Sequence, residues 1–351
     1  MKTLQSGLTN KILIVGPCSA ESKEQLRQIA SGLSKFNLNY FRAGIWKPRT
    51  MPSSFEGVGS IGLTWLKDIK KEYSLKVCCE VANPNHVEQC LNAGIDALWI
   101  GARTTTNPFS VQDIADSLKG EQMPIFVKNP LNPDLKLWIG AIERLQKAGI
   151  ESVFAVHRGF SLTDNGIYRQ TPLWQIPIEL KRIFPEIKII SDSSHIAGKR
   201  EFVASLSQTA MNLGLDGLML EVHNQPDLAK TDSQQQLSLQ EFENLMNNLN
   251  ITNTDENYLP ETIEVLRNKI DNIDKKIIEL LGERMVVSNQ IAQVKKRLNL
   301  SVLQVNRWSK LLSDRMVYSN KKQLSENFTK ELFELIHKES VRIQDEIIKK
   351  E

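Results

Sequence analysis

The chain has 351 residues, of which 41% are hydrophobic and 24% charged, and its formal net charge is +3. These proportions fit a folded globular protein and exclude a disordered or fibrous one. The small, dispersed charge argues against a nucleic-acid partner, and no apolar run reaches the roughly 18 residues of a membrane span. Without an apolar signal segment at its start, the chain is expected to be cytoplasmic. Its length allows a barrel of about 250 residues and roughly 100 residues more.

Short apolar runs alternate with amphipathic stretches from residue 12 to about 249, which is typical of strand–helix units around a parallel sheet. The predicted strands are 12–15, 39–42, 76–81, 96–101, 123–128, 152–157, 187–191 and 216–222. Helical patterns lie near 22–36, 61–73, 85–93, 111–119, 136–148, 174–183, 199–213 and 238–249. Eight repeats of one unit favour an α/β fold of the closed (β/α)8 barrel type, with an open doubly wound sheet as the alternative.

A polar, proline-containing stretch predicts the boundary between two domains. We expect a barrel domain at 1–250, a linker at 251–261 and an all-helical domain at 262–351. Beyond the linker, apolar residues recur at three- and four-residue spacing over roughly 35 residues, which predicts one long helix. Two further helices are expected near 301–319 and 326–350.

Polar residues follow nearly every predicted barrel strand, at the end where such barrels place their sites. Four cations there would repel one another unless an anionic ligand neutralised them, so a phosphate-bearing carboxylate is expected. These cations are Arg49, Arg103, Lys128 and Arg158. A second set offers sulfur, nitrogen and oxygen ligands to a divalent transition metal, with a position left open for water or a carbonyl. It comprises Cys18, His195, Glu221 and Asp232.

The strings GPCS, KPRT, GAR, VKNP, HRG, DSSH and LEVH occur in this order between residue 12 and about 245. They resemble the compact type I family of 3-deoxy-D-arabino-heptulosonate 7-phosphate (DAHP) synthases. The resemblance implies that phosphoenolpyruvate condenses with erythrose 4-phosphate, that water adds at C2 and that phosphate leaves. KPRT favours this reaction over the octulosonate synthase alternative, which uses arabinose 5-phosphate.

The same resemblance assigns roles to the strand-end residues. The four cations would bind phosphoenolpyruvate, and the mixed ligand set would hold one divalent metal ion per barrel, Mn²⁺ first, with Fe²⁺, Co²⁺ or Zn²⁺ as alternatives. The erythrose 4-phosphate side would be formed by Lys47, Arg49, Thr50 and Asp192. Lys47 and metal-bound water are the two candidates for proton delivery. Cys78, Cys79 and Cys90 are expected to be packing residues, and Glu80 a supporting one.

In the tail, Arg284 and Lys295 are eleven residues apart, so they lie within roughly 20° of each other on one helix face. Arg267 precedes Arg284 by seventeen residues, about 25 Å along the axis, which is too far to contact the same small molecule. If Arg267 is functional, it must therefore serve a neighbouring chain. Ser340 and Gln344 share a face of the last helix.

The pattern LRNKID, GERM, QVKK and ESVRIQ resembles the all-helical chorismate mutase family across residues 262 to 350. The resemblance implies a homodimer, or a higher assembly, that converts chorismate to prephenate. Arg284, Arg307 and the partner subunit's Arg267 would bind the carboxylates, while Lys295 and Gln344 would contact the ether oxygen. Ser340 and Gln304 are further substrate-binding candidates. The family commonly has an acidic residue where Trp308 stands, and that residue binds the substrate hydroxyl.

Two other interpretations of the tail stay open. It could be a plain helical dimerisation segment, or a module that senses a ligand for the barrel and turns little over. Because the sequence starts shortly before the first strand, we expect feedback by prephenate or chorismate to act through the tail.

Overall fold

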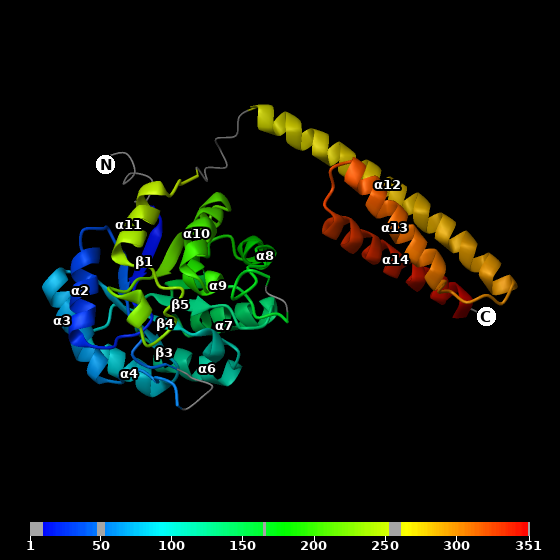
Figure 1. Cartoon of the computed structure of the whole chain (residues 1–351). Helices are drawn as coiled ribbons and strands as arrows, with labels where there is room; N and C mark the ends of the chain where they lie inside the picture. The colour runs from blue at the N-terminus through cyan, green and yellow to red at the C-terminus, as the bar shows by residue number, and fades with distance from the viewer. Residues whose placement is uncertain (1–9, 48–52, 164–165, 253–260, 350–351) are drawn as a thin grey trace. The chain divides into compact units, whose positions relative to one another are not determined.

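The computed structural model describes residues 10–47, 53–163, 166–252 and 261–349 (Figure 1). The chain forms two compact units, Met1–Thr254 and Asp255–Glu351. Most of the linker expected at 251–261 lies outside the described residues, so the bounds of the two domains stay a prediction. None of the described helices is both long and apolar enough to cross a membrane.

Eight parallel strands close into a barrel, in which each strand pairs with its sequence neighbour and β1 pairs with β8. They are β1 Ile12–Gly16, β2 Tyr40–Arg42, β3 Val77–Val81, β4 Ala97–Ile100, β5 Ile125–Lys128, β6 Val153–His157, β7 Ile189–Asp192 and β8 Gly217–Glu221. The predicted (β/α)8 barrel is confirmed, and the open-sheet alternative is wrong. The purely parallel arrangement explains why the strands read as apolar runs, since both faces of such a sheet are buried.

Helices surround the barrel and follow the predicted pattern (Figure 1). The longer ones are α2 Lys23–Leu33, α3 Ile61–Tyr73, α4 Pro84–Ala93, α6 Pro108–Ser117, α7 Leu135–Lys147, α8 Gln175–Ile183, α10 Val203–Asn212 and α11 Leu239–Asn248. The stretch predicted near 199–213 begins with the short helix η1 Arg200–Phe202. Three other short helices were not predicted, because so few residues show no amphipathic period. They are α5 Ala102–Thr105, α9 Ser193–Ala197 and η2 Pro226–Leu228.

Large side chains fill the barrel interior and form a floor beneath its C-terminal rim. Ile14, Trp99, Phe126 and Met219 are fully buried in one interior cluster. The Arg42 guanidinium lies 5.0 Å from the centroid of the Trp99 ring, which is within the range of a cation–π contact. The polar residues of the rim therefore lie above a packed layer of large side chains.

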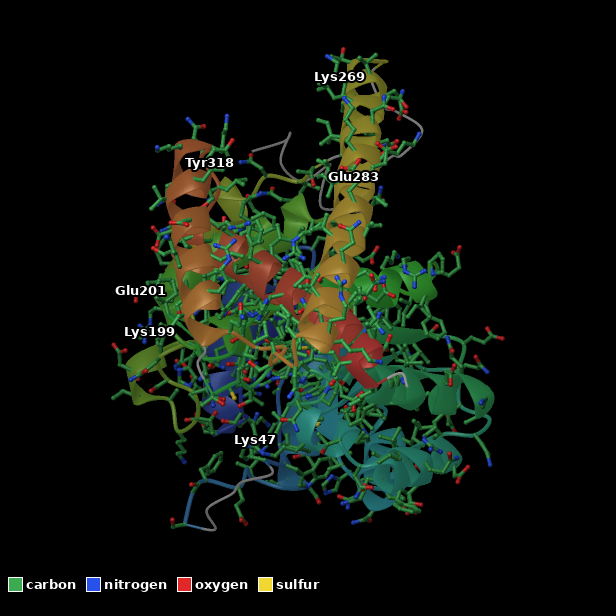
Figure 2. All side chains as sticks on the ribbon, turned by 90° about the vertical axis from the view of Figure 1, so that its right-hand side faces the viewer. Lys47, Lys199, Glu201, Lys269, Glu283 and Tyr318 are labelled. Carbon is green, nitrogen blue, oxygen red and sulfur yellow. The ribbon has the colours of Figure 1, made fainter. Side chains whose placement is uncertain are left out.

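The second unit contains three helices, α12 Glu261–Arg297, α13 Val305–Lys321 and α14 Glu326–Lys349. The all-helical tail is confirmed, and α14 packs against both other helices. The first part of α12 has no cover within the described part of the chain, since every side chain from 262 to 280 is exposed. Figure 2 labels Lys269 and Glu283 on this helix and Tyr318 on α13.

Candidate functional site

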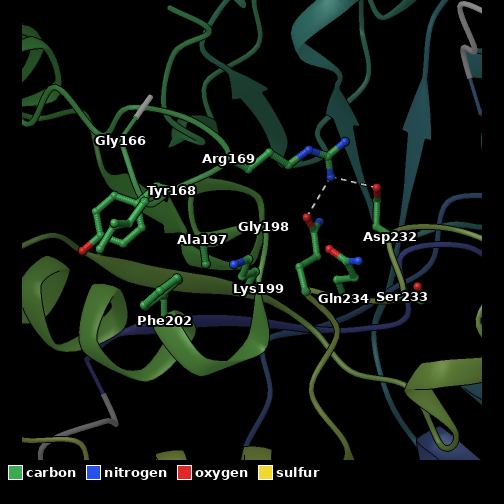
Figure 3. Close-up of a pocket in the computed structure, with 12 residues that line it drawn as sticks. Gly166, Tyr168, Arg169, Ala197, Gly198, Lys199, Phe202, Asp232, Ser233 and Gln234 are labelled. Carbon is green, nitrogen blue, oxygen red and sulfur yellow. Dashed lines mark hydrogen bonds and ion pairs between the residues drawn. The ribbon is translucent and has the colours of Figure 1, made fainter. Parts of the chain in front are cut away.

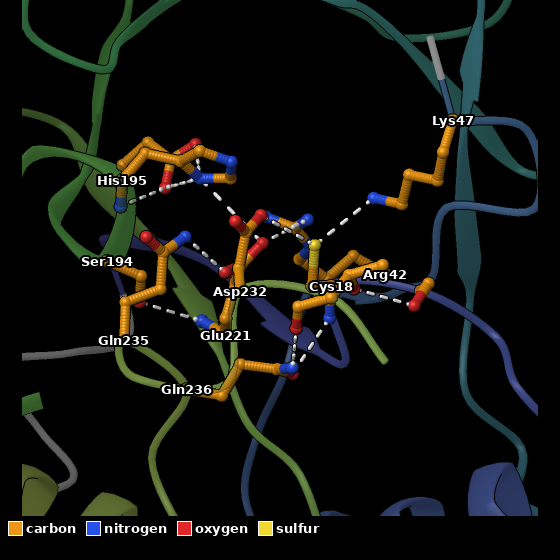
Figure 4. Close-up of polar contacts among 12 residues, drawn as sticks. Cys18, Arg42, Lys47, Ser194, His195, Glu221, Asp232, Gln235 and Gln236 are labelled. Atoms are coloured by element: carbon orange, nitrogen blue, oxygen red, sulfur yellow. Dashed lines mark hydrogen bonds and ion pairs between the residues drawn. The ribbon is translucent and has the colours of Figure 1, made fainter. Parts of the chain in front are cut away.

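A thiol and two carboxylates meet at the C-terminal rim of the barrel (Figure 4). Cys18 follows β1, Glu221 ends β8, and Asp232 lies in the loop beyond β8. One ligand atom from each residue lies within 4.8 Å of the other two, and Cys18 Sγ is 3.2 Å from Asp232 Oδ2. Asp232 has a φ of 48°, a left-handed conformation that aspartate adopts more readily than most residues. Mixed sulfur and oxygen donors at this spacing fit a divalent transition metal.

His195, the fourth expected ligand, lies at the edge of this cluster on α9. Its Nδ1 is 3.0 Å from Asp192 Oδ1 and 3.7 Å from Glu221 Oε1. Asp192 also accepts a 2.7 Å hydrogen bond from Lys128 Nζ. A carboxylate on one ring nitrogen is the usual way to orient a histidine that binds metal through the other nitrogen. The described geometry therefore joins three of the four expected ligands directly and places the fourth beside them.

Both carboxylate oxygens of Glu221 are held by buried neighbours. Arg42 Nη2 donates to Oε1 at 3.0 Å, and Gln235 Nε2 donates to Oε2 at 2.6 Å. Burial alone would raise the pKa of Glu221, but His195 and Arg42 outweigh it and lower that pKa. Glu221 is therefore ionised at neutral pH, and these two hydrogen bonds fix the orientation of its carboxylate as a possible metal ligand.

Beside the cluster lies a cavity of about 240 Å³ with five cationic side chains on its wall. They are Lys47, Arg103, Lys128, Arg158 and Arg169. Burial lowers the pKa of Arg158 to about 10, and its Nη1 has no hydrogen-bond partner in the described part of the chain. A buried guanidinium with an unmet N–H favours an anionic ligand, because that N–H would otherwise lose its bond to water.

The expected substrate-binding residues of the barrel lie in different places. Arg103, Lys128 and Arg158 share the cationic cavity, whereas Arg49 and Thr50 lie outside the described residues. Asp192, expected on the erythrose 4-phosphate side, is fully buried and pairs with Lys128 and His195. Lys47 reaches the cation cavity and also the metal-capable cluster, where its Nζ donates to Cys18 Sγ at 3.2 Å.

Three residues of the site were given no role from the sequence. Arg42 ends β2, so its position at the rim was visible, but its ion pair with Glu221 was not. Arg169 and Gln235 lie in loops well past the strands, where no sequence signal distinguishes them. Arg169 Nη1 donates to Asp232 Oδ1 and to Gln235 Oε1, both at 2.8 Å.

A second cavity of about 670 Å³ adjoins the first and shares Arg169 and Asp232 with it (Figure 3). Tyr168, Lys199 and Phe202 form part of its wall. The ion pair between Arg169 and Asp232 therefore borders both spaces.

The remaining residues singled out from the sequence are mostly packing groups. The four cysteines are unpaired and buried, and three of them lie outside the metal-capable cluster. His157 is also buried, and burial lowers its pKa to about 3. Glu80 lines the cationic cavity.

In the helical unit, a cavity of about 310 Å³ brings together side chains of all three helices. Arg284 Nη1 donates to Ser340 Oγ, and Lys295 Nζ donates to Gln344 Oε1 at 3.1 Å. The α13 side of the wall contributes Gln304, Arg307 and Trp308. Arg267 is not part of this wall; its guanidinium pairs with Glu264 at 3.2 Å. The expected mutase residues of one chain thus line a single pocket, except Arg267.

Comparison with known proteins identifies both units. Residues 2–256 match the DAHP synthetase I family, and residues 266–345 match the chorismate mutase type II family. Phospho-2-dehydro-3-deoxyheptonate aldolase of Thermotoga maritima is 29% identical over 234 residues, covering 67% of each protein. The 2-dehydro-3-deoxyphosphooctonate aldolase of Desulfotalea psychrophila is 29% identical over 259 residues, covering 68% of this chain and 88% of that protein.

The solved structures agree with the sequence matches. A crystal structure of the Thermotoga maritima DAHP synthase superposes with a TM-score of 0.62 and 27% identity, over 68% of each chain. The two matched families support two enzyme activities, a DAHP synthase in the barrel and a chorismate mutase in the helical unit. The chain belongs to the DAHP synthetase I family, and a chorismate mutase type II domain follows its barrel in the sequence.

Proposed function

We propose that this protein is a bifunctional shikimate-pathway enzyme whose barrel reaction depends on a divalent metal ion. The observation that carries the proposal is the thiol–carboxylate cluster of Cys18, Glu221 and Asp232 beside a cavity lined by five cations. Such a pair of features suits one substrate that is both a phosphate and a carboxylate, and a second substrate with a carbonyl group. Phosphoenolpyruvate and erythrose 4-phosphate meet these requirements.

The protein's own groups would bind and orient phosphoenolpyruvate. Arg103, Lys128 and Arg158 would hold its phosphate and carboxylate, and their charge would stabilise the anion through the transition state. Lys47, next to Cys18, stands where a proton could be delivered at the reacting end of the cavity. Cys18, Glu221 and Asp232, with His195 beside them, would hold the metal ion. That ion, when bound, polarises a carbonyl oxygen or positions a water molecule. Mn²⁺ is our first choice, and Fe²⁺, Co²⁺ and Zn²⁺ suit the same donors.

Metal dependence can be tested on the purified full chain. We expect chelation to abolish DAHP formation, and restoring Mn²⁺ to recover it, while chorismate turnover by the same sample stays unchanged. Full synthase activity in protein shown by elemental analysis to be metal-free would overturn the metal assignment.

In the helical pocket, catalysis would need no covalent step. Arg284 and Arg307 would bind the chorismate carboxylates, and Lys295 and Gln344 would contact the ether oxygen whose bond breaks. Holding the reactive conformer and stabilising the separating charge are enough to accelerate such a rearrangement. Ser340 would support Arg284, because its hydroxyl accepts a hydrogen bond from that guanidinium.

We propose that a second copy of the chain completes this pocket. Ile270, Ile273 and Ile277 lie on α12 with exposed fractions of 57%, 55% and 49%. An apolar helix face of this kind is stable in water only when a partner covers it. A partner helix along α12 would also bring the partner subunit's Arg267 to this pocket, whose wall does not include the Arg267 of the same chain.

We further propose that prephenate or chorismate bound in the helical pocket inhibits the barrel reaction. The pocket in the helical unit contains cationic side chains that suit a dicarboxylate such as prephenate or chorismate. An effector that differs chemically from the substrates of the barrel can act from a site other than the barrel's own. We expect saturating prephenate to slow the wild-type synthase and to leave the Arg284→Ala synthase unaffected. An unchanged wild-type rate at saturating prephenate would refute the feedback.

A further inference from the structure

The wall of the mutase pocket includes a histidine, His337, that has no role in the assignment above. His337 lies on α14, three residues before Ser340 and seven before Gln344, so all three share one helix face. Ser340 accepts from Arg284, and Gln344 accepts from Lys295 at 3.1 Å. His337 therefore continues the substrate-facing row of α14 by one turn.

Trp308 holds the His337 ring in place from α13. The two rings stack with centroids 4.0 Å apart and planes 13° from parallel. His337 Nε2 is buried and has no hydrogen-bond partner in the described part of the chain. A buried, unpartnered polar atom is costly and rare in native proteins, and in an enzyme cavity it suggests a missing ligand group. Stacking uses only the face of the His337 ring, so both ring nitrogens stay available for hydrogen bonds.

The chemistry of chorismate leaves one group for this ring. Its two carboxylates suit the guanidinium groups, and its ether oxygen suits Lys295 and Gln344, so the ring hydroxyl remains unassigned. We propose that His337, positioned by Trp308, hydrogen-bonds the hydroxyl of chorismate. The proposal rests on the mutase function above. The group that binds the hydroxyl would then lie on the facing helix α14 and not on α13, where Trp308 stands in place of the family's acidic residue and offers no acceptor.

The charge state of His337 suits a neutral partner. Burial lowers the pKa of His337, and the positive charges of Arg284 and Lys295 lower it further. The ring is therefore neutral at pH 7 and does not compete with the cations for the carboxylates. A neutral imidazole has one donor and one acceptor nitrogen, and a hydroxyl can satisfy either, so both tautomers can make the bond.

The test compares two substrates across a matched set of variants. His337→Phe keeps an aromatic ring against Trp308 but removes both nitrogens. We expect this change to lower kcat/KM for chorismate by about tenfold, the worth of one hydrogen bond in a closed site. With a chorismate analogue that lacks the ring hydroxyl, kcat/KM should change less than about twofold. His337→Gln, which restores a polar group of similar reach, should recover part of the chorismate rate.

The control is Val341→Ala, which trims an apolar side chain in the wall of the same pocket. It should affect both substrates equally. Trp308→Ala should also lower kcat/KM more for chorismate than for the analogue that lacks the hydroxyl. The double variant with His337→Phe should have nearly the same kcat/KM as His337→Phe alone, because Trp308 acts through His337. Equal losses with both substrates in the His337→Phe protein would overturn the proposal. A wild-type protein without chorismate turnover would instead refute the mutase function itself.

Discussion

Arg42 and Glu221 form an ion pair in the interior of the barrel rim, with Arg42 Nη2 donating to Glu221 Oε1 at 3.0 Å. Their side chains are only 1% and 0% exposed. Glu221 is also one of the three metal-capable residues, so this pair links the stability of the barrel to its site. Removing one partner of a buried pair leaves the other charge without compensation, which typically costs about 3–5 kcal/mol.

We therefore expect Arg42→Met to lower the free energy of unfolding of the barrel by about 3–5 kcal/mol and to weaken metal binding. Denaturant unfolding and a metal titration measure the two effects. The control is Arg27→Met, because Arg27 pairs with Glu72 at the surface, where water and salt screen the two charges and the pair contributes little to stability. Similar losses in the two variants would contradict a special role for the buried pair.

Cys18 should be the cysteine on which metal binding depends. We expect Cys18→Ser to lose most bound metal and most DAHP synthase activity, because a hydroxyl is a much weaker ligand than a thiolate for these ions. Cys90→Ser is the matched control, since Cys90 is also buried but lies on α4, outside the cluster. Metal content per barrel, measured by elemental analysis, should fall only in the Cys18 variant. Retention of metal by Cys18→Ser would show that the thiol is not a ligand.

His157 should make the barrel sensitive to mild acid. Burial lowers its pKa to about 3 in the folded protein, whereas an unfolded histidine titrates near 6.5. As the pH falls below about 6.5, His157 binds a proton in the unfolded state but not in the folded state. The free energy of unfolding therefore decreases as the pH falls from about 6.5 to about 3. For this one residue the loss is about 1.4 kcal/mol per pH unit.

The comparison is between metal-free wild type and His157→Phe, unfolded by denaturant at several values between pH 6 and 4. The variant should lose stability less steeply, by about one proton's worth of slope, because its ring cannot be protonated. Parallel stability curves would show that His157 is not a source of the acid sensitivity.

The dimer proposal makes a complementation experiment decisive. Arg267→Ala and Arg284→Ala homodimers should each lack chorismate mutase activity. After mixing and subunit exchange, about half of the dimers are mixed, and each mixed dimer has one intact site, so about a quarter of all sites recover. Rates measured before and after exchange test this. No recovery, with exchange verified by differently tagged chains, would show that Arg267 serves its own chain or no site.

Much of the fold could be predicted because local patterns determine it. Apolar runs about five residues long marked the strands, and the three–four repeat marked α12. The short helix α9 escaped detection because Ser193–Ala197 is too brief to show a period, although it carries His195. Helices this short are missed because the amphipathic pattern needs more residues to be recognised.

The site was only partly predictable, for a geometric reason. Strand ends can be read from the sequence, which brought Cys18, Lys128 and Glu221 to one rim. Pairings across the barrel interior cannot, and Arg42 and Glu221 are 179 residues apart. Loop residues such as Arg169 are harder still, because no strand determines where they lie. The distances between the strand-end groups therefore had to come from the structure.

The central claim, a bifunctional enzyme that makes DAHP and prephenate, is tested most directly by one assay series on the metal-reconstituted full chain. Phosphoenolpyruvate is supplied with erythrose 4-phosphate or with arabinose 5-phosphate, and chorismate is tested in parallel. We expect turnover of the four-carbon sugar phosphate and of chorismate, and none of the five-carbon sugar phosphate. Preference for arabinose 5-phosphate, or no condensation with metal restored, would contradict the account.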